Sequence, residues 1–189
     1  MTRNQIIAIQ KKIGTEPDGI WGRESIRMCE AYLRGLMPKN LKWPKPDDAS
    51  MHKFYGEPGD INNLVNASVA GLGVRYFGTP VKTVRCHKLV ADSLVAALDD
   101  IASGPYCHIL MEYAGCFNFR PMRGGTRYSK HAWGVAIDLL PSKNGLHTHW
   151  PSKATMPFEV MEAFARQGWV GLGWAIHRDA MHFEATAAT

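Results

Sequence analysis

The sequence lacks an apolar run long enough to cross a membrane. None of its 189 residues belongs to a stretch approaching the ~18 consecutive apolar residues of a transmembrane helix. The opening letters "MTRNQIIAIQKK" also lack the apolar region and small-residue cleavage site of a signal peptide. We therefore expect no membrane insertion and a soluble protein made in the cytosol.

Cysteine is scarce and unpatterned. The four cysteines show neither a CxxC pair nor even spacing, which argues against a thiolate zinc site and against a disulfide framework. The sequence instead predicts buried free thiols at Cys29, Cys86, Cys107 and Cys116.

Hydrophobic and basic residues are well represented. A hydrophobic content of 46% over this length predicts one main domain with a small appendage. The net charge of +5 favours an anionic partner such as nucleic acid, a membrane surface or a cell-wall polymer. Charge alone does not choose among these.

Apolar spacing predicts two short helices at the N-terminus. Ile6, Ile9 and Ile13 recur at helical spacing within residues 3–13, and a second helix follows the turn "GTEPDGIWG". A unit of about 36 residues is too small to hold much core alone. We expect it to lean on the rest of the chain, from which residues 37–60, rich in proline, separate it.

The remaining chain alternates helical and strand patterns without a regular rhythm. Residues 88–102 predict a helix whose core face carries Leu89, Leu94, Val95, Leu98 and Ile101. "CHILMEY" and "GVAIDLL" predict strands, "PFEVMEAFARQGW" predicts a helix with Pro157 in its first turn, and the C-terminal "GWAIHRDAMHFEA" predicts a turn and a strand. This mixture favours an α+β fold, with a small antiparallel sheet and flanking helices.

An acid follows an apolar run in "SKHAWGVAID". Asp138 in such a strand needs a partner, because an unpaired buried charge costs several kcal/mol. His131 lies seven positions earlier, and the pair suits zinc, which in catalytic sites takes three protein ligands and a water. His182 is the candidate third ligand, and Asp179 is placed to act as a general base. The pair alone is also compatible with hydrogen-bonded structural residues.

Two runs resemble a known enzyme family. "GCFNFRPMRGGTRYSKHAWGVAIDLLP" and "WVGLGWAIHRDAMHFE" are similar to the bacterial cell-wall zinc peptidases that comprise D-alanyl-D-alanine carboxypeptidases and phage L-alanyl-D-glutamate endolysins. The family pattern is SxHxxGxAxD followed by an acid-x-x-His, and its fixed positions are met by Ser129, His131, Gly134, Ala136, Asp138, Asp179 and His182. The similarity covers roughly residues 50–186.

The resemblance implies roles for the residues that match. It makes His131, Asp138 and His182 the zinc ligands, with the zinc site held by the small sheet and its flanking helices, and Asp179 the base. Many carboxypeptidases of the family have glutamate at the base position, whereas endolysins often have aspartate. Asp179 therefore favours an endopeptidase.

Substrate contacts are implied upstream. Arg120 stands where the family has an arginine that binds substrate and stabilises charge on the scissile carbonyl, a role that suits a permanently charged guanidinium. Arg123 and Arg127 are competing choices, with a solvated basic loop as the simpler interpretation. Ser129 either hydrogen-bonds the substrate peptide or forms a turn.

Other polar residues near the motifs receive weaker interpretations. A fourth protein ligand would close the zinc site, so we interpret His177 as a residue of the rim. His147 and His149 form a pair that we expect to face solvent. Glu184 lies two residues beyond His182, where it would support the site from the same strand face.

The N-terminal segment resembles part of a peptidoglycan-binding module. The matching residues are Gln10, Gly14, Asp18, Gly19, Trp21 and Gly22. The segment is shorter than the usual module, and a plain helical hairpin packed on the catalytic domain is the alternative. The domain hypothesis is therefore a peptidoglycan-binding-like helical segment at 1–40 and a zinc peptidase catalytic domain at 41–189.

The implied function is zinc-dependent hydrolysis of peptidoglycan stem peptides. An L-alanyl-D-glutamate endopeptidase acting as a phage endolysin is favoured, as a monomer held in the host cytoplasm until the inner membrane is opened. The alternatives are a D-alanyl-D-alanine carboxypeptidase and a non-catalytic, zinc-bearing wall-binding module. A nucleic-acid binder is disfavoured, because the site-type residues gather near the C-terminus.

Overall fold

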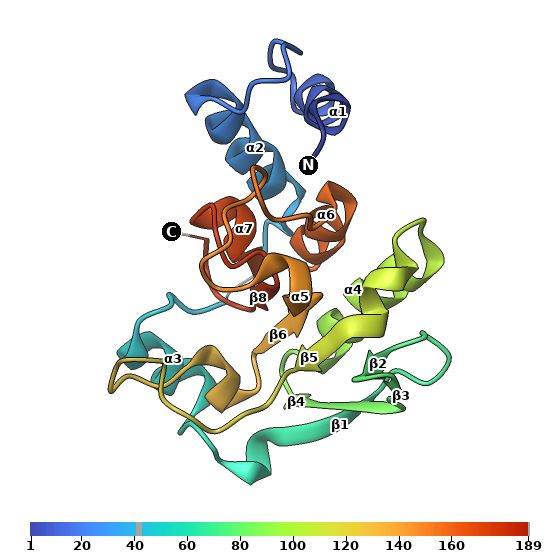
Figure 1. Ribbon diagram of the computed structural model, residues 1–189. Coiled ribbons are helices and arrows are strands. Elements are labelled where there is room, and N and C mark those ends of the chain that lie inside the picture. The colour runs from blue at the N-terminus through green and yellow to red at the C-terminus, as the bar shows by residue number, and fades with distance from the viewer. Residues whose placement is uncertain (41–42, 189) are drawn as a thin grey trace.

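The computed structural model describes residues 1–40 and 43–188 as a mixture of helices and short antiparallel strands (Figure 1). The α-helices are α1 (Arg3–Ile13), α2 (Arg23–Leu36), α3 (Asp48–Tyr55), α4 (Ala91–Ser103), α5 (Pro141–Asn144), α6 (Phe158–Arg166) and α7 (Leu172–Ala175). The 3-10 helices are η1 (Ile61–Asn63), η2 (Cys107–Glu112) and η3 (Lys130–Trp133). The strands are β1 (Leu64–Ser68), β2 (Arg75–Tyr76), β3 (Thr79–Pro80), β4 (Thr83–His87), β5 (Tyr113–Gly115), β6 (Ala136–Leu139), β7 (Val170–Gly171) and β8 (His182–Glu184). No helix of the described ranges has both the length and the apolar character needed to span a bilayer.

The four-stranded sheet forms the centre of the molecule. Its strand order is β5-β6-β8-β7 with antiparallel pairing, and Asp138 of β6 pairs with His182 of β8. On its apolar face Phe183 stacks on Phe164 of α6 with ring centroids 4.0 Å apart. The predicted α+β fold with a small antiparallel sheet is confirmed.

Two further antiparallel ribbons, β1–β4 and β2–β3, lie at the opposite end of the molecule from α1 and α2 (Figure 1). On β4 burial alternates: Val84 and Cys86 are buried, whereas Arg85 between them is exposed. No strand was predicted from the sequence in this part of the chain.

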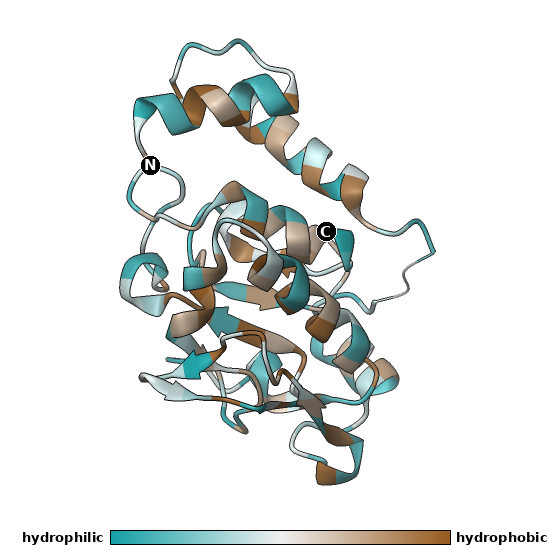
Figure 2. Cartoon of the chain, turned by 90° about the vertical axis from the view of Figure 1, so that its right-hand side faces the viewer, coloured by the Kyte–Doolittle hydropathy of each residue, from teal (hydrophilic) through white to brown (hydrophobic). Residues whose placement is uncertain are grey.

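The two predicted N-terminal helices are confirmed as α1 and α2. Thr2 and Gln5 form a capping box at the start of α1, and Gly14 ends the helix in the left-handed conformation that glycine tolerates. The pair lies at one end of the molecule, above α6 and α7 (Figures 1 and 2). The buried face of the pair packs against the body of the protein. This agrees with the expectation that the pair leans on the rest of the chain.

A buried carboxylate joins this helix pair to the body. Glu162 of α6 is only 3% exposed. One of its carboxylate oxygens accepts a hydrogen bond from Lys12 Nζ and the other accepts one from the Tyr32 hydroxyl, each at 2.7 Å. Charged and hydroxyl donors from α1 and α2 therefore compensate the same buried acid.

Three details differ from the sequence-based predictions. Most of "CHILMEY" is the 3-10 helix η2, with strand structure only from Tyr113. The helix predicted at 88–102 begins at Ala91, which leaves Leu89 outside it and 51% exposed. Cys107 is exposed, while the other three cysteines are buried free thiols as predicted.

Candidate metal centre

A short capped turn brings His131 and Asp138 together. Ser129 precedes η3, and its hydroxyl accepts a hydrogen bond from the His131 N–H at 3.4 Å. Gly134 then reverses the chain with φ of +69°, which suits a residue without Cβ, and β6 carries Asp138 back toward the imidazole.

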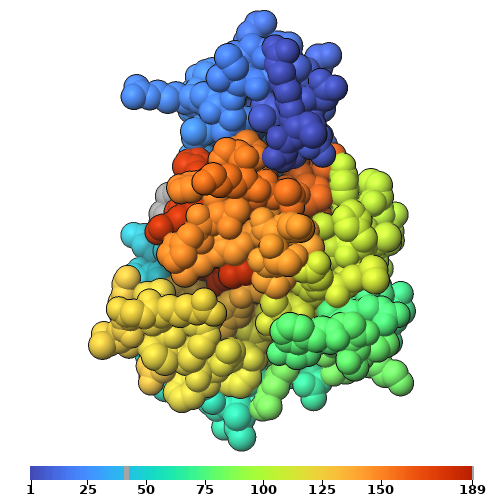
Figure 3. All heavy atoms as spheres, viewed as in Figure 1, coloured from blue at the N-terminus to red at the C-terminus, as the bar shows by residue number. Residues whose placement is uncertain are grey.

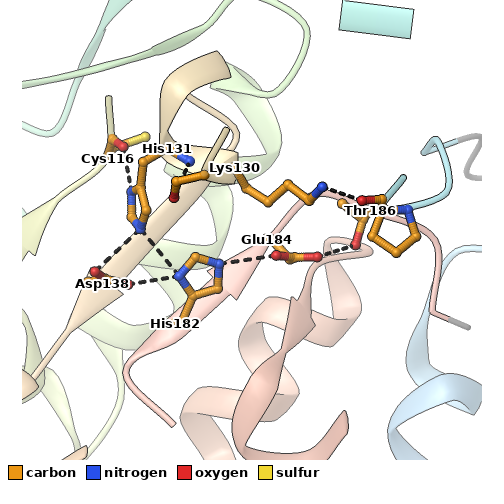
Figure 4. A network of polar contacts seen from close by, with 9 residues as sticks. Cys116, Lys130, His131, Asp138, His182, Glu184 and Thr186 are labelled. Carbon is orange, nitrogen blue, oxygen red and sulfur yellow. Dashed lines mark hydrogen bonds and ion pairs between the residues drawn. The ribbon is translucent and has the colours of Figure 1, made fainter. Parts of the chain in front are cut away.

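Three side chains converge on one point (Figure 4). His131 Nε2 lies 3.3 Å from Asp138 Oδ2, His182 Nδ1 lies 3.0 Å from Asp138 Oδ1, and the two ring nitrogens are 3.2 Å apart. One ligand atom from each of the three residues lies within 4.8 Å of the ligand atoms of the other two. Two imidazoles and one carboxylate are a donor set of the kind that catalytic zinc uses.

The outer ring nitrogens are already occupied by hydrogen bonds. His131 Nδ1–H donates to the Cys116 carbonyl at 2.7 Å, and His182 Nε2–H donates to Glu184 Oε2 at 3.1 Å. Thr186 in turn donates its hydroxyl to Glu184 Oε1 at 2.8 Å. When both rings are neutral, these bonds leave the lone pairs of His131 Nε2 and His182 Nδ1 directed at one point beside Asp138, an arrangement that a shared cation stabilises.

The charges around the rings also favour a cation. Burial acts to raise the pKa of Asp138, but hydrogen bonds from His131 and His182 outweigh it and hold that pKa well below its usual range. Burial alone would lower the pKa of His182, yet Asp138 and Glu184 raise it to about 10. The carboxylates of Asp138 and Glu184 are largely shielded from solvent and both contact His182, so a positive charge there is favourable. A proton or a metal ion can supply that charge, and the residues therefore fit a zinc ion.

Asp179 lies beside this centre without a partner of its own. It is 6% exposed, and its buried Oδ1 has no hydrogen bond within the described part of the chain. Its backbone is left-handed, with φ of +56°, a strained conformation for a non-glycine residue. Burial raises its pKa, which brings the carboxyl closer to the range in which it can exchange protons near neutral pH.

The centre forms the floor of a cavity of about 610 Å³ lined in part by arginines. In Figure 3 atoms of the red C-terminal segment appear in a hollow between the orange segment above and the yellow segment below. Arg120, Arg123 and Arg127 line this cavity, and no carboxylate of the described residues forms an ion pair with them.

Only some of the other sequence-predicted residues line the cavity. Ser129 lines the cavity and also caps η3, so both interpretations of this serine fit its position. His177 turns toward α2, with Nε2 3.6 Å from the carboxylate of Glu30. His149 pairs its backbone with Arg178 in an isolated bridge.

Some contacts around the centre could not be found from sequence patterns. The Cys116 carbonyl that orients His131 is a backbone atom, and Lys130, whose Nζ binds the Pro46 carbonyl, acts across 84 positions of the chain. Neither contact leaves a signal in residue spacing.

Comparison with known proteins supports a peptidase. Residues 123–185 match a family model described as D-alanyl-D-alanine carboxypeptidase. The matched segment contains the three converging residues and Asp179, whereas Arg120 and the N-terminal helix pair lie outside it. Searches of curated proteins and of solved structures gave no match. The family match and the His-Asp-His group together support a metallopeptidase.

Proposed function

We propose that this chain is a zinc-dependent peptidase that hydrolyses peptidoglycan stem peptides at the L-alanyl-D-glutamate bond, acting as an endolysin. The observation that carries the proposal is the convergence of His131 Nε2, His182 Nδ1 and the Asp138 carboxylate beneath a cavity that also receives Asp179. Two nitrogen ligands and one oxygen ligand leave a coordination position free for substrate or water.

The chain's own groups divide the work of amide hydrolysis. When bound, zinc would supply Lewis acidity that polarises a carbonyl and acidifies a water. Asp179 accepts a proton from the attacking water and passes it to the leaving amine. Arg120 provides a fixed positive charge for the oxygen of the scissile carbonyl, where charge develops in the transition state.

The shape of the cleft favours an endopeptidase. An enzyme that cuts within a peptide needs space on both sides of the scissile bond. One cavity reaches from the centre toward Leu172 and Ile176, and a second, of about 390 Å³, reaches from His131 and Asp138 toward Tyr76. A carboxypeptidase is the second candidate, favoured by the description of the matching family model.

The cellular setting belongs to the same proposal. As an endolysin the protein would act as a monomer on bacterial peptidoglycan, remaining in the host cytoplasm until the inner membrane is permeabilised. Residues 1–40 would contribute to wall binding, because their "DGIWG" turn resembles that of peptidoglycan-binding modules.

Product analysis tests the proposal. Purified peptidoglycan is digested with the zinc-loaded protein, and the released material is identified by mass spectrometry. Stem peptides with a new N-terminal D-glutamate support the endopeptidase, whereas release of single D-alanine identifies a carboxypeptidase. A His131→Ala variant is the control, and intact peptidoglycan after treatment with zinc-loaded wild type would refute both activities.

A further inference from the structure

The second cavity is lined in part by residues that have no role in the proposed catalysis. It begins at His131 and Asp138 and extends to Tyr76 of β2, Arg85 of β4 and Tyr113 of β5. It therefore joins the metal centre to the two small ribbons, which come from a different part of the chain than the matched segment at 123–185.

Arg85 is held in place although its side chain is exposed. Its backbone carbonyl accepts a hydrogen bond from the Phe117 N–H at 3.2 Å, and its guanidinium lies 5.4 Å from the centroid of the Phe117 ring. The neighbouring Cys116 carbonyl is the group that orients His131. One short run of backbone thus fixes both Arg85 and a metal ligand, so their separation is set by the fold.

The charge of Arg85 is not neutralised by the protein. No carboxylate of the described residues pairs with it, and Arg123, which lines the same cavity, likewise has no ion pair there. Other exposed arginines form ion pairs with carboxylates: Arg166 binds Asp100 at 2.9 Å and Arg27 binds Glu24 at 2.6 Å. A planar guanidinium without an ion-pair partner, in a cavity that Tyr76 and Tyr113 also line, suits a carboxylate that it can bind with two hydrogen bonds.

We propose that Arg85 is a specificity-determining residue that binds a free carboxylate of the peptide substrate, one that takes no part in the cleavage. The inference rests on the proposed peptidase function. In a stem peptide cut before D-glutamate, the α-carboxylate of that D-glutamate is the group of this kind nearest the scissile bond. Replacing it by a carboxamide removes the charge with little change in shape, so the pocket distinguishes the two forms.

Two synthetic peptides test this role, identical except that the D-glutamate carries a free α-carboxylate in one and an α-carboxamide in the other. For wild type we expect kcat/KM to be about 10- to 100-fold higher with the carboxylate, the range expected for a hydrogen bond to a charged group. Arg85→Gln should abolish that preference by raising KM for the carboxylate peptide, with kcat nearly unchanged. Arg85→Lys should retain part of it.

A matched control and a binding measurement separate the possible failures. Arg23→Gln removes the same charge from exposed α2 at the far end of the molecule and should keep the full preference. Calorimetry on Asp179→Asn, with and without Arg85→Gln, measures affinity for both peptides without cleavage. Equal affinity and equal kcat/KM for the two peptides would overturn the carboxylate pocket even if both are cut. Preference in binding without any cleavage by wild type would sustain the pocket and refute the proposed peptidase.

Discussion

Two aspartates lie close to the same centre but are held in different ways. Asp138 is hydrogen-bonded to both imidazoles, whereas Asp179 has a buried oxygen without a partner in the described residues. Asp179→Asn should therefore keep zinc and lower the rate by about 10²- to 10⁴-fold, the usual range for loss of a general base. Asp138→Asn should lose zinc affinity, with activity partly restored by excess zinc.

Zinc content and stem-peptide cleavage, measured on both variants, check this assignment. Loss of zinc from Asp179→Asn together with retention in Asp138→Asn would mean that the two roles are reversed.

Glu184 orients the imidazole of His182. Its carboxylate accepts a hydrogen bond from His182 Nε2–H at 3.1 Å. This bond directs Nδ1 of His182 toward the centre. Glu184→Gln keeps an acceptor but removes the charge, and we expect zinc affinity to fall by about 10- to 100-fold.

Competition with a chromophoric chelator measures the affinity. Thr186→Val, which removes only the hydroxyl that binds Glu184, should show a smaller loss. An unchanged affinity in Glu184→Gln would remove Glu184 from the support of the site.

At the scale of elements, the turn between η3 and β6 controls the site. A Cβ at Gly134 would lie 3.0 Å from the backbone N of His87 and would also require a strained left-handed conformation. Gly71 has a positive φ as well, but a Cβ there meets nothing within 4 Å. Gly71→Ala should cost about 1–2 kcal/mol of unfolding free energy from backbone strain alone, and Gly134→Ala should cost about 1–3 kcal/mol more from crowding.

Urea unfolding of both variants gives the two values, and zinc titration should show weakened binding only for Gly134→Ala. Equal destabilisation of the two variants would mean that the β4 backbone yields to the added methyl group.

The long elements and the grouping of His131, Asp138 and His182 were predicted from the sequence better than the short elements. Helical periodicity located α2 and α4, and the spacing of His131 and Asp138 indicated a site because both act through their side chains. The run "CHILMEY" was wrongly predicted as a strand, since a short apolar run has no periodicity that separates a strand from a buried 3-10 helix. Arg85 went unnoticed because its relation to the site arises from the pairing of distant segments.

The N-terminal helix pair contributes to the stability of the whole molecule. Deleting residues 1–40 removes Lys12 and Tyr32, the two donors to the Glu162 carboxylate, together with the apolar face of α1 and α2 that packs on the body. Because the deletion exposes apolar surface that the pair buries and leaves the Glu162 charge without its two donors, we expect the shortened protein to unfold at a clearly lower temperature. Adding Glu162→Gln to the deletion should recover part of the loss.

Thermal unfolding followed by circular dichroism measures the effect, and pelleting with purified cell wall measures wall binding in parallel. Unchanged stability with lost pelleting would identify the pair as a wall-binding module that adds nothing to folding. Lower stability with intact pelleting of the remaining soluble protein would identify it as a structural cap.

The pairing of Asp138 with His182 has a further consequence, because these two residues are 44 positions apart. A metal ion joining them would close a loop containing α5, α6, β7 and α7, and would act as a crosslink that lowers the entropy of partly open states. Chelation should then speed amide hydrogen exchange in α6, where Glu162 anchors the N-terminal helices, more than in the β1–β4 ribbon outside the loop. Uniform acceleration across both would show that zinc stabilises the fold as one unit, and that its crosslink confers no local rigidity.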